Sequence, residues 1–141
     1  MANPADPTPA RRELLELAQA LIHGRQTVLP KRLGAPGPDA AQTQAIVEAA
    51  ASAPDHHELL PWRFVMVPEQ ARARLADAFA AALTQRDAQA GAAQIAQARE
   101  KAYRAPLLLL AVVRLRDQDA EIEPHERIVS AGCALQNVLL M

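Results

Sequence analysis

The segment that most constrains this fold runs from Pro124 to Met141 and has the periodicity of a helix. Its apolar and small residues occupy most of the helix circumference: Ile128, Val129, Ala131, Gly132, Cys133, Leu135, Leu139 and Leu140. A helix that is apolar on nearly every side has to be covered on nearly every side. We therefore expect this helix to be central in the fold, and we expect the chain to end inside it.

Only two segments are predicted strands. The first, Trp62–Val67, is rich in strand-forming residues and stops at Pro68. The second, Leu107–Leu115, is continuously apolar, which is typical of a strand covered on both faces. Other helices are predicted at about residues 14–24, 40–52, 69–85 and 92–103. The pattern predicts an α+β domain, in which two strands are few for covering the last helix.

The composition excludes several classes of protein. A chain of 141 residues is long enough for one domain with a core. A net charge of -1 and an aromatic content of 3% argue against nucleic acid as a partner. No apolar run approaches the roughly 20 residues that span a bilayer, and the amino terminus does not resemble a secretory signal, so we expect no membrane association and a cytoplasmic protein. Residues 1–12 are predicted to be a flexible tail, and residues 13–141 the domain.

The segment from Arg25 to Pro38 contains three prolines and two glycines and is predicted to be a long loop. Its first residues, Arg25-Gln26-Thr27, are followed by Lys31 and Arg32. A guanidinium, a hydroxyl and further cations suit a phosphate group, because arginine binds phosphate in a bidentate way. A solvated basic loop explains the same residues, and composition alone favours it. After this loop, Asp39 and Gln42 form a predicted capping box for the helix at 40–52.

The remaining polar motif is His56-His57-Glu58, which invites a metal-site interpretation. Adjacent loop residues rarely direct both imidazoles at one ion, and no two histidines have the four-residue spacing of helical ligands. We therefore predict no metal site. The single cysteine, Cys133, excludes an internal disulfide and lies in a helical run of small residues, where packing explains it.

Four motifs, taken in order, resemble the nitroreductase family, and in particular its small single-domain NAD(P)H nitroreductases. They are Arg25-Gln26-Thr27; Ala53-Pro54-Asp55-His56 with Pro61-Trp62-Arg63-Phe64; Arg104-Ala105-Pro106; and Ser130-Ala131-Gly132-Cys133-Ala134. The resemblance extends from about Leu14 to Met141. It implies a nitroreductase-like fold, with an antiparallel sheet flanked by helices.

The resemblance also implies a function. Such proteins are homodimers that hold FMN at the subunit interface and use NAD(P)H as co-substrate. Hydride passes through flavin N5 to a small-molecule electron acceptor such as a nitroaromatic compound or a quinone. The chemistry takes place on the flavin, so no protein side chain is expected to be catalytic.

The residues at the family's flavin-contacting positions match the family pattern to different degrees. Arg25, Gln26 and Thr27 match a family triplet that grips FMN, although the usual second residue is arginine. His56 matches a loop histidine that meets the flavin of the partner subunit. Ser52 stands where some relatives have a flavin-contacting arginine, so that contact is expected to be weak here.

Family members continue beyond the last helix into a glycine-rich turn that closes over the FMN phosphate, and the sequence contains no such turn after Met141. The chain is therefore expected to be a truncated, amino-terminal portion of the family domain. One alternative is a non-catalytic remnant that only dimerises or binds a partner. A weaker one is a metal-dependent hydrolase that uses His56, His57 and Glu58.

Overall fold

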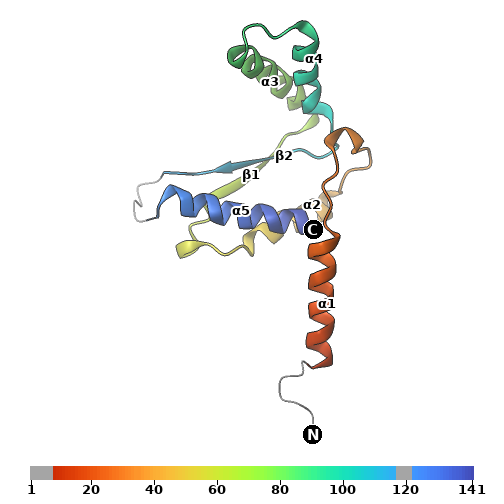
Figure 1. Ribbon diagram of the computed structural model, residues 1–141, viewed down its shortest axis with the longest axis vertical. Helices are drawn as coiled ribbons and strands as arrows, with labels where there is room; N and C mark the ends of the chain where they lie inside the picture. Colours follow the sequence, from red (N-terminus) through yellow and green to blue (C-terminus); the bar gives the residue numbers. More distant parts are fainter. Residues whose placement is uncertain (1–7, 117–121) are drawn as a thin grey trace.

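The computed structural model describes residues 8–116 and 122–141, and Figure 1 shows its helices around a small sheet. The elements are α1 (Pro9–Gly24), η1 (Pro30–Arg32), α2 (Ala40–Ala51), η2 (His56–Glu58), β1 (Trp62–Met66), η3 (Glu69–Ala71), α3 (Arg72–Arg86), α4 (Ala92–Glu100), η4 (Lys101–Tyr103), β2 (Leu109–Val113) and α5 (Pro124–Leu140). Every predicted helix and strand is present. The predicted α+β class is confirmed.

The two strands pair antiparallel, from Trp62 opposite Val113 to Met66 opposite Leu109. Alternate residues of β1 point to opposite faces of the sheet. Trp62 and Phe64 pack against the core, whereas Val65 on the other face is 42% exposed. The prediction that the second strand is covered on both faces is wrong for the described chain, because Leu110 is 51% exposed. The helices that pack against Trp62 and Phe64 cover only one face.

The core forms where α2 packs against α5. Ala50 of α2 and Ala134 of α5 are almost fully buried, and the small side chains let the two helices approach closely. Asn137 of α5 adds a hydrogen bond from its side-chain amide to the Ala49 carbonyl, 3.1 Å long. The predicted capping box at the start of α2 is confirmed, since the Asp39 side chain accepts from the Gln42 N–H at 2.8 Å and the Gln42 side chain accepts from the Asp39 N–H at 2.9 Å.

Helix α5 is covered on one side only. Its buried residues are Arg127, Ser130, Ala131 and Ala134. Its other side carries exposed apolar residues, among them Ile128, Val129 and Leu139 at 53%, 65% and 59% exposure. In the described part of the chain α5 contacts α2, the strands and η2, so two strands are indeed few for covering this helix, as the sequence predicts.

Helix α1 extends away from the sheet and α5 and has no buried residue. It begins at Pro9, so residues 9–12, assigned to the tail by sequence, are helical. Residues 1–7 of that tail lie outside the described residues. So do residues 117–121, which precede α5 in the sequence. The apolar stripe of α1 faces solvent in this chain, and its members are Leu14, Leu15, Leu17, Leu21 and Ile22.

Helices α3 and α4 form a pair beyond one end of the sheet (Figure 1). Arg72, which is buried at the start of α3, joins this pair to the strands. Its guanidinium donates to four backbone carbonyls, those of Val67 (3.2 Å), Ala102 (2.7 Å), Ala105 (3.2 Å) and Pro106 (3.3 Å). These oxygens belong to the segments that lead from β1 into α3 and from α4 into β2. One side chain therefore fixes both connections.

We expect Arg72→Met to destabilise the fold by about 2–4 kcal/mol, because it leaves buried carbonyls without a donor. Urea unfolding followed by circular dichroism measures this. The matched control is Arg74→Met, on the exposed face of the same helix, which should change the free energy of unfolding by no more than about 0.5 kcal/mol. Equal effects of the two substitutions would contradict the role assigned to Arg72.

Candidate flavin site

The loop after α1 places the predicted phosphate-binding side chains next to each other. Arg25 is half-buried, and its Nη1 donates to Thr27 Oγ1 at 3.1 Å. Gln26 between them is exposed, and so are Lys31 and Arg32 in η1. The loop thus presents a guanidinium and a hydroxyl side by side, with two further cations a few residues away. This is a donor set that suits an anionic oxygen ligand.

Ser52 lies at the carboxy-terminal cap of α2, where its N–H donates to the Ala49 carbonyl at 3.3 Å. Its side chain is exposed. Its structural role is to end α2 and turn the chain into the loop that carries His56. A serine side chain reaches much less far than an arginine, so Ser52 offers only a short hydroxyl at this position.

The loop around His56 has an unusual backbone. His57, Glu58 and Leu60 have φ angles of 58°, 52° and 44°, in the left-handed region that side chains disfavour. Such residues persist only when their surroundings fix them. Here the Asp55 side chain accepts from the Leu60 N–H, and Arg114 donates from Nη2 to the Leu59 carbonyl at 3.3 Å. These two bonds fix the end of the loop: Asp55 holds Leu60, and Arg114, the first residue after β2, holds Leu59.

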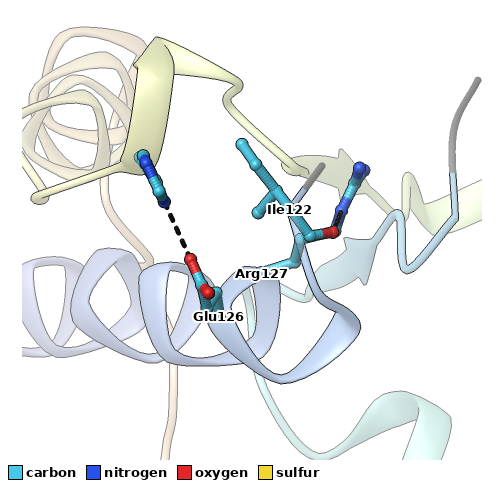
Figure 2. Close-up of polar contacts among 4 residues, drawn as sticks. Ile122, Glu126 and Arg127 are labelled. Atoms are coloured by element: carbon cyan, nitrogen blue, oxygen red, sulfur yellow. Dashed lines mark hydrogen bonds and ion pairs between the residues drawn. The ribbon is translucent and has the colours of Figure 1, made fainter. Parts of the chain in front are cut away.

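His56 forms a hydrogen bond with Glu126 that no sequence pattern indicates. Its Nδ1 lies 2.8 Å from Oε2 of Glu126, and Figure 2 shows Glu126 reaching from the first turn of α5 toward η2. The hydrogen bond with His56 is the main cause that lowers the pKa of Glu126; desolvation opposes it, and the charges of His56 and His125 lower the pKa further. The two residues are 70 positions apart, so no local pattern could indicate the pair.

The triplet and His56 do not meet within one chain. In Figure 1 the end of α1, which leads into the triplet, lies near the end of α5 marked C, whereas η2 lies near the start of α5. Helix α5 is 17 residues long, about 25 Å at the usual rise per residue. None of the five predicted site residues lines the cavity of about 280 Å³ beside Pro61 and Trp62, or that of about 580 Å³ between α2 and the strands. They lie on open surface.

No group of three metal-ligating side chains gathers anywhere in residues 8–116 and 122–141. The rings of His56 and His57 are stacked, with centroids 4.5 Å apart and planes 13° from parallel. Nitrogens of parallel rings do not converge on one ion, which weighs against the hydrolase alternative. Among the helices described, none is long and apolar enough to cross a membrane.

The family of the chain is shown by comparison with known proteins. A family model described as "Nitroreductase family" matches residues 22–141, which is most of the sequence. The chain belongs to the nitroreductase family. A solved structure of a nitroreductase family protein from Clostridium novyi NT aligns with a TM-score of 0.57 over 85% of this chain and 60% of that one, at 16% identity. This likeness confirms the predicted nitroreductase-like fold.

Two curated relatives are similar in sequence. A Haemophilus influenzae protein named "Putative NAD(P)H nitroreductase" is 34% identical over 110 residues, which cover 78% of this chain and 59% of the relative. The Escherichia coli K12 protein "Putative NAD(P)H nitroreductase YdjA" is 32% identical over 123 residues, which cover 86% of this chain and 63% of the relative. The chain thus spans about three fifths of the length of these relatives.

The His56–Glu126 pair should make stability depend on pH in the acid range. The folded-state pKa of Glu126 lies below its ordinary value of 4.5, so Glu126 contributes stability above pH 4.5. That contribution is lost as the pH falls through the lowered pKa. The free energies of unfolding of the natural chain and of Glu126→Gln, measured in urea, should therefore differ at neutral pH and converge as the pH falls below 4.5. A constant difference at all pH values would show that the ionised carboxylate is not responsible.

Proposed function

We propose that this chain contributes to an FMN-dependent NAD(P)H oxidoreductase that reduces a nitroaromatic compound, a quinone or a similar acceptor. The observation that carries the proposal is the family match over residues 22–141, which includes every predicted site residue. The names of the two curated relatives point to the same activity. NAD(P)H as co-substrate, a nitroaromatic compound or quinone as acceptor, and the cytoplasmic location stay predictions.

The loop after α1 supports the cofactor assignment. The phosphate of FMN carries close to two negative charges, and its oxygens accept hydrogen bonds. Arg25 and Thr27 already lie in contact, so a guanidinium and a hydroxyl are positioned to bind one such group. Gln26 adds an amide in place of a charge, and Lys31 and Arg32 add positive potential. Bound FMN would supply the hydride transfer, and these residues would hold and orient its phosphate.

The separation of the triplet from His56 supports a site built by two chains. In an antiparallel pair of α5 helices, the end of one helix lies beside the start of the other. The triplet of one chain and His56 of its partner would then be neighbours, with Ser52 close to His56 in sequence. The exposed apolar side of α5 and the apolar stripe of α1 provide the surface for such a homodimer.

The second candidate is a remnant that dimerises or binds a partner without flavin. One observation favours it: the candidate donors for phosphate after α1 are exposed, except Arg25, which is half-buried. Purification decides between the candidates. A chain that holds FMN is yellow and oxidises NAD(P)H in the presence of an acceptor, whereas a remnant is colourless and does neither, even after incubation with FMN.

Arg25→Ala should weaken FMN binding by about 1.5–3 kcal/mol, the usual contribution of a charged hydrogen bond, or roughly tenfold or more in dissociation constant. Titration of the flavin-free chain with FMN measures it. Arg11→Ala removes an exposed arginine from α1 and should leave the constant unchanged. If Arg25→Ala binds FMN as tightly as the natural chain, the phosphate assignment fails.

The chain should self-associate at micromolar concentration, because α1 and α5 expose too much apolar surface for an isolated monomer. Sedimentation equilibrium should show a dimer. Leu17→Asp, in the apolar stripe of α1, should weaken association roughly tenfold, while Gln19→Asp on the same helix should have little effect. A monomer that binds no apolar dye would contradict the proposed interface.

A further inference from the structure

We propose that Glu126 is a positioning residue for His56, holding its ring by Nδ1 so that Nε2 is the nitrogen presented to the flavin. The second half of this inference rests on the proposed function. The first half concerns the chain alone and can be tested without cofactor.

The contact itself determines where the proton of His56 lies. An ionised carboxylate has acceptor atoms only, so the Nδ1 atom that lies 2.8 Å from Glu126 has to carry a hydrogen and donate. The lowered pKa of Glu126 keeps that carboxylate ionised at neutral pH. Neutral His56 is therefore held in the tautomer with the hydrogen on Nδ1, and its Nε2 is left as an acceptor. Protonated His56 presents Nε2–H as a donor instead.

Glu126 is itself held in a fixed place. It lies in the first turn of α5, which begins with Pro124, and the next residue, Arg127, is 2% exposed. Arg127 donates from Nε to the Ile122 carbonyl at 3.1 Å, and Figure 2 shows this bond at the start of the helix. The buried guanidinium ties the helix start to the segment before it. The carboxylate of Glu126 therefore approaches η2 from a rigid element.

His56 is held from the other side by the strained loop. His57 and Glu58 directly after it are in the left-handed region, and the stacked ring of His57 limits the rotation of His56. Among the described residues, the ionisable groups beside the pair include His125, which acts on the Glu126 carboxylate, and Asp55 and Glu58 on the loop. Asp55 is occupied by the Leu60 N–H, so Glu126 is the carboxylate that contacts His56.

This arrangement has a use in the proposed site. The carboxylate on Nδ1 fixes the orientation of the ring, and a cationic ring that donates from Nε2 would stabilise negative charge on a neighbouring group. A flavin gains negative charge when it is reduced. Glu126 would then act on the cofactor through His56, without touching it.

The tautomer is tested on the full chain without flavin, by ¹⁵N NMR of the His56 ring at a pH where it is neutral, with the signal assigned by its loss in His56→Asn. The natural chain should show the hydrogen on Nδ1. Glu126→Gln should keep it there, because the amide oxygen still accepts, whereas Glu126→Ala should shift it toward Nε2. Glu123→Ala removes a neighbouring carboxylate and should change nothing. The same tautomer in the natural chain and in Glu126→Ala would overturn the proposal.

The role toward flavin is tested by FMN titration of Glu126→Ala, His56→Ala and the double variant. Glu126→Ala should weaken binding about two- to tenfold, and it should have no further effect once His56 is absent. Additive losses would overturn an action through His56. If the natural chain binds no FMN at all, the proposed function fails and the flavin half of this inference fails with it. The tautomer measurement then still decides whether Glu126 positions the ring.

Discussion

The packing of α5 on α2 is the contact on which the rest of this structure depends. Ala50 and Ala134 are small enough to bring the two helices close together, and Trp62 and Phe64 of the sheet pack against the same cluster. Because α5 is rigid, this one contact also fixes what lies at its two ends. Glu126 at its start meets the His56 loop, and its other end lies near the loop that follows α1. The geometry of both candidate half-sites therefore follows from a core made largely of alanine.

Two arginines, Arg72 and Arg127, are buried in the described residues, and each stabilises the connection between two elements. Arg72 satisfies four carbonyls where the α3–α4 pair joins the strands, and Arg127 ties down the start of α5. The strain of the His56 loop is offset by two hydrogen bonds: the Asp55 carboxylate accepts from the Leu60 N–H, and Arg114 donates to the Leu59 carbonyl. This loop lies within residues 22–141, which the family model matches, and strained loops concentrate at functional sites.

The family fold is retained although the Clostridium novyi protein shares only 16% of aligned residues. At such low sequence identity, relatives still share the pattern of apolar and small positions that forms the helices, the strands and their contacts. The pattern persists because packing tolerates exchange among residues of similar volume. The proposed flavin-binding residues depend on more local features. Arg25, Thr27 and His56 are individual contacts on loops, and loops change more readily than the packed elements that carry them.

The sequence by itself determined the elements and their local chemistry. The capping box at Asp39 and Gln42, the strand that stops before Pro68 and the contact of Arg25 with Thr27 depend on residues close together in the chain, which a sequence pattern can register. Only the tertiary structure decided that α5 is covered on one side, that β2 is open on one face, and that Glu126 is the partner of His56. Those outcomes depend on which surfaces meet after the chain has folded. Residues 70 positions apart carry no local signal of their meeting.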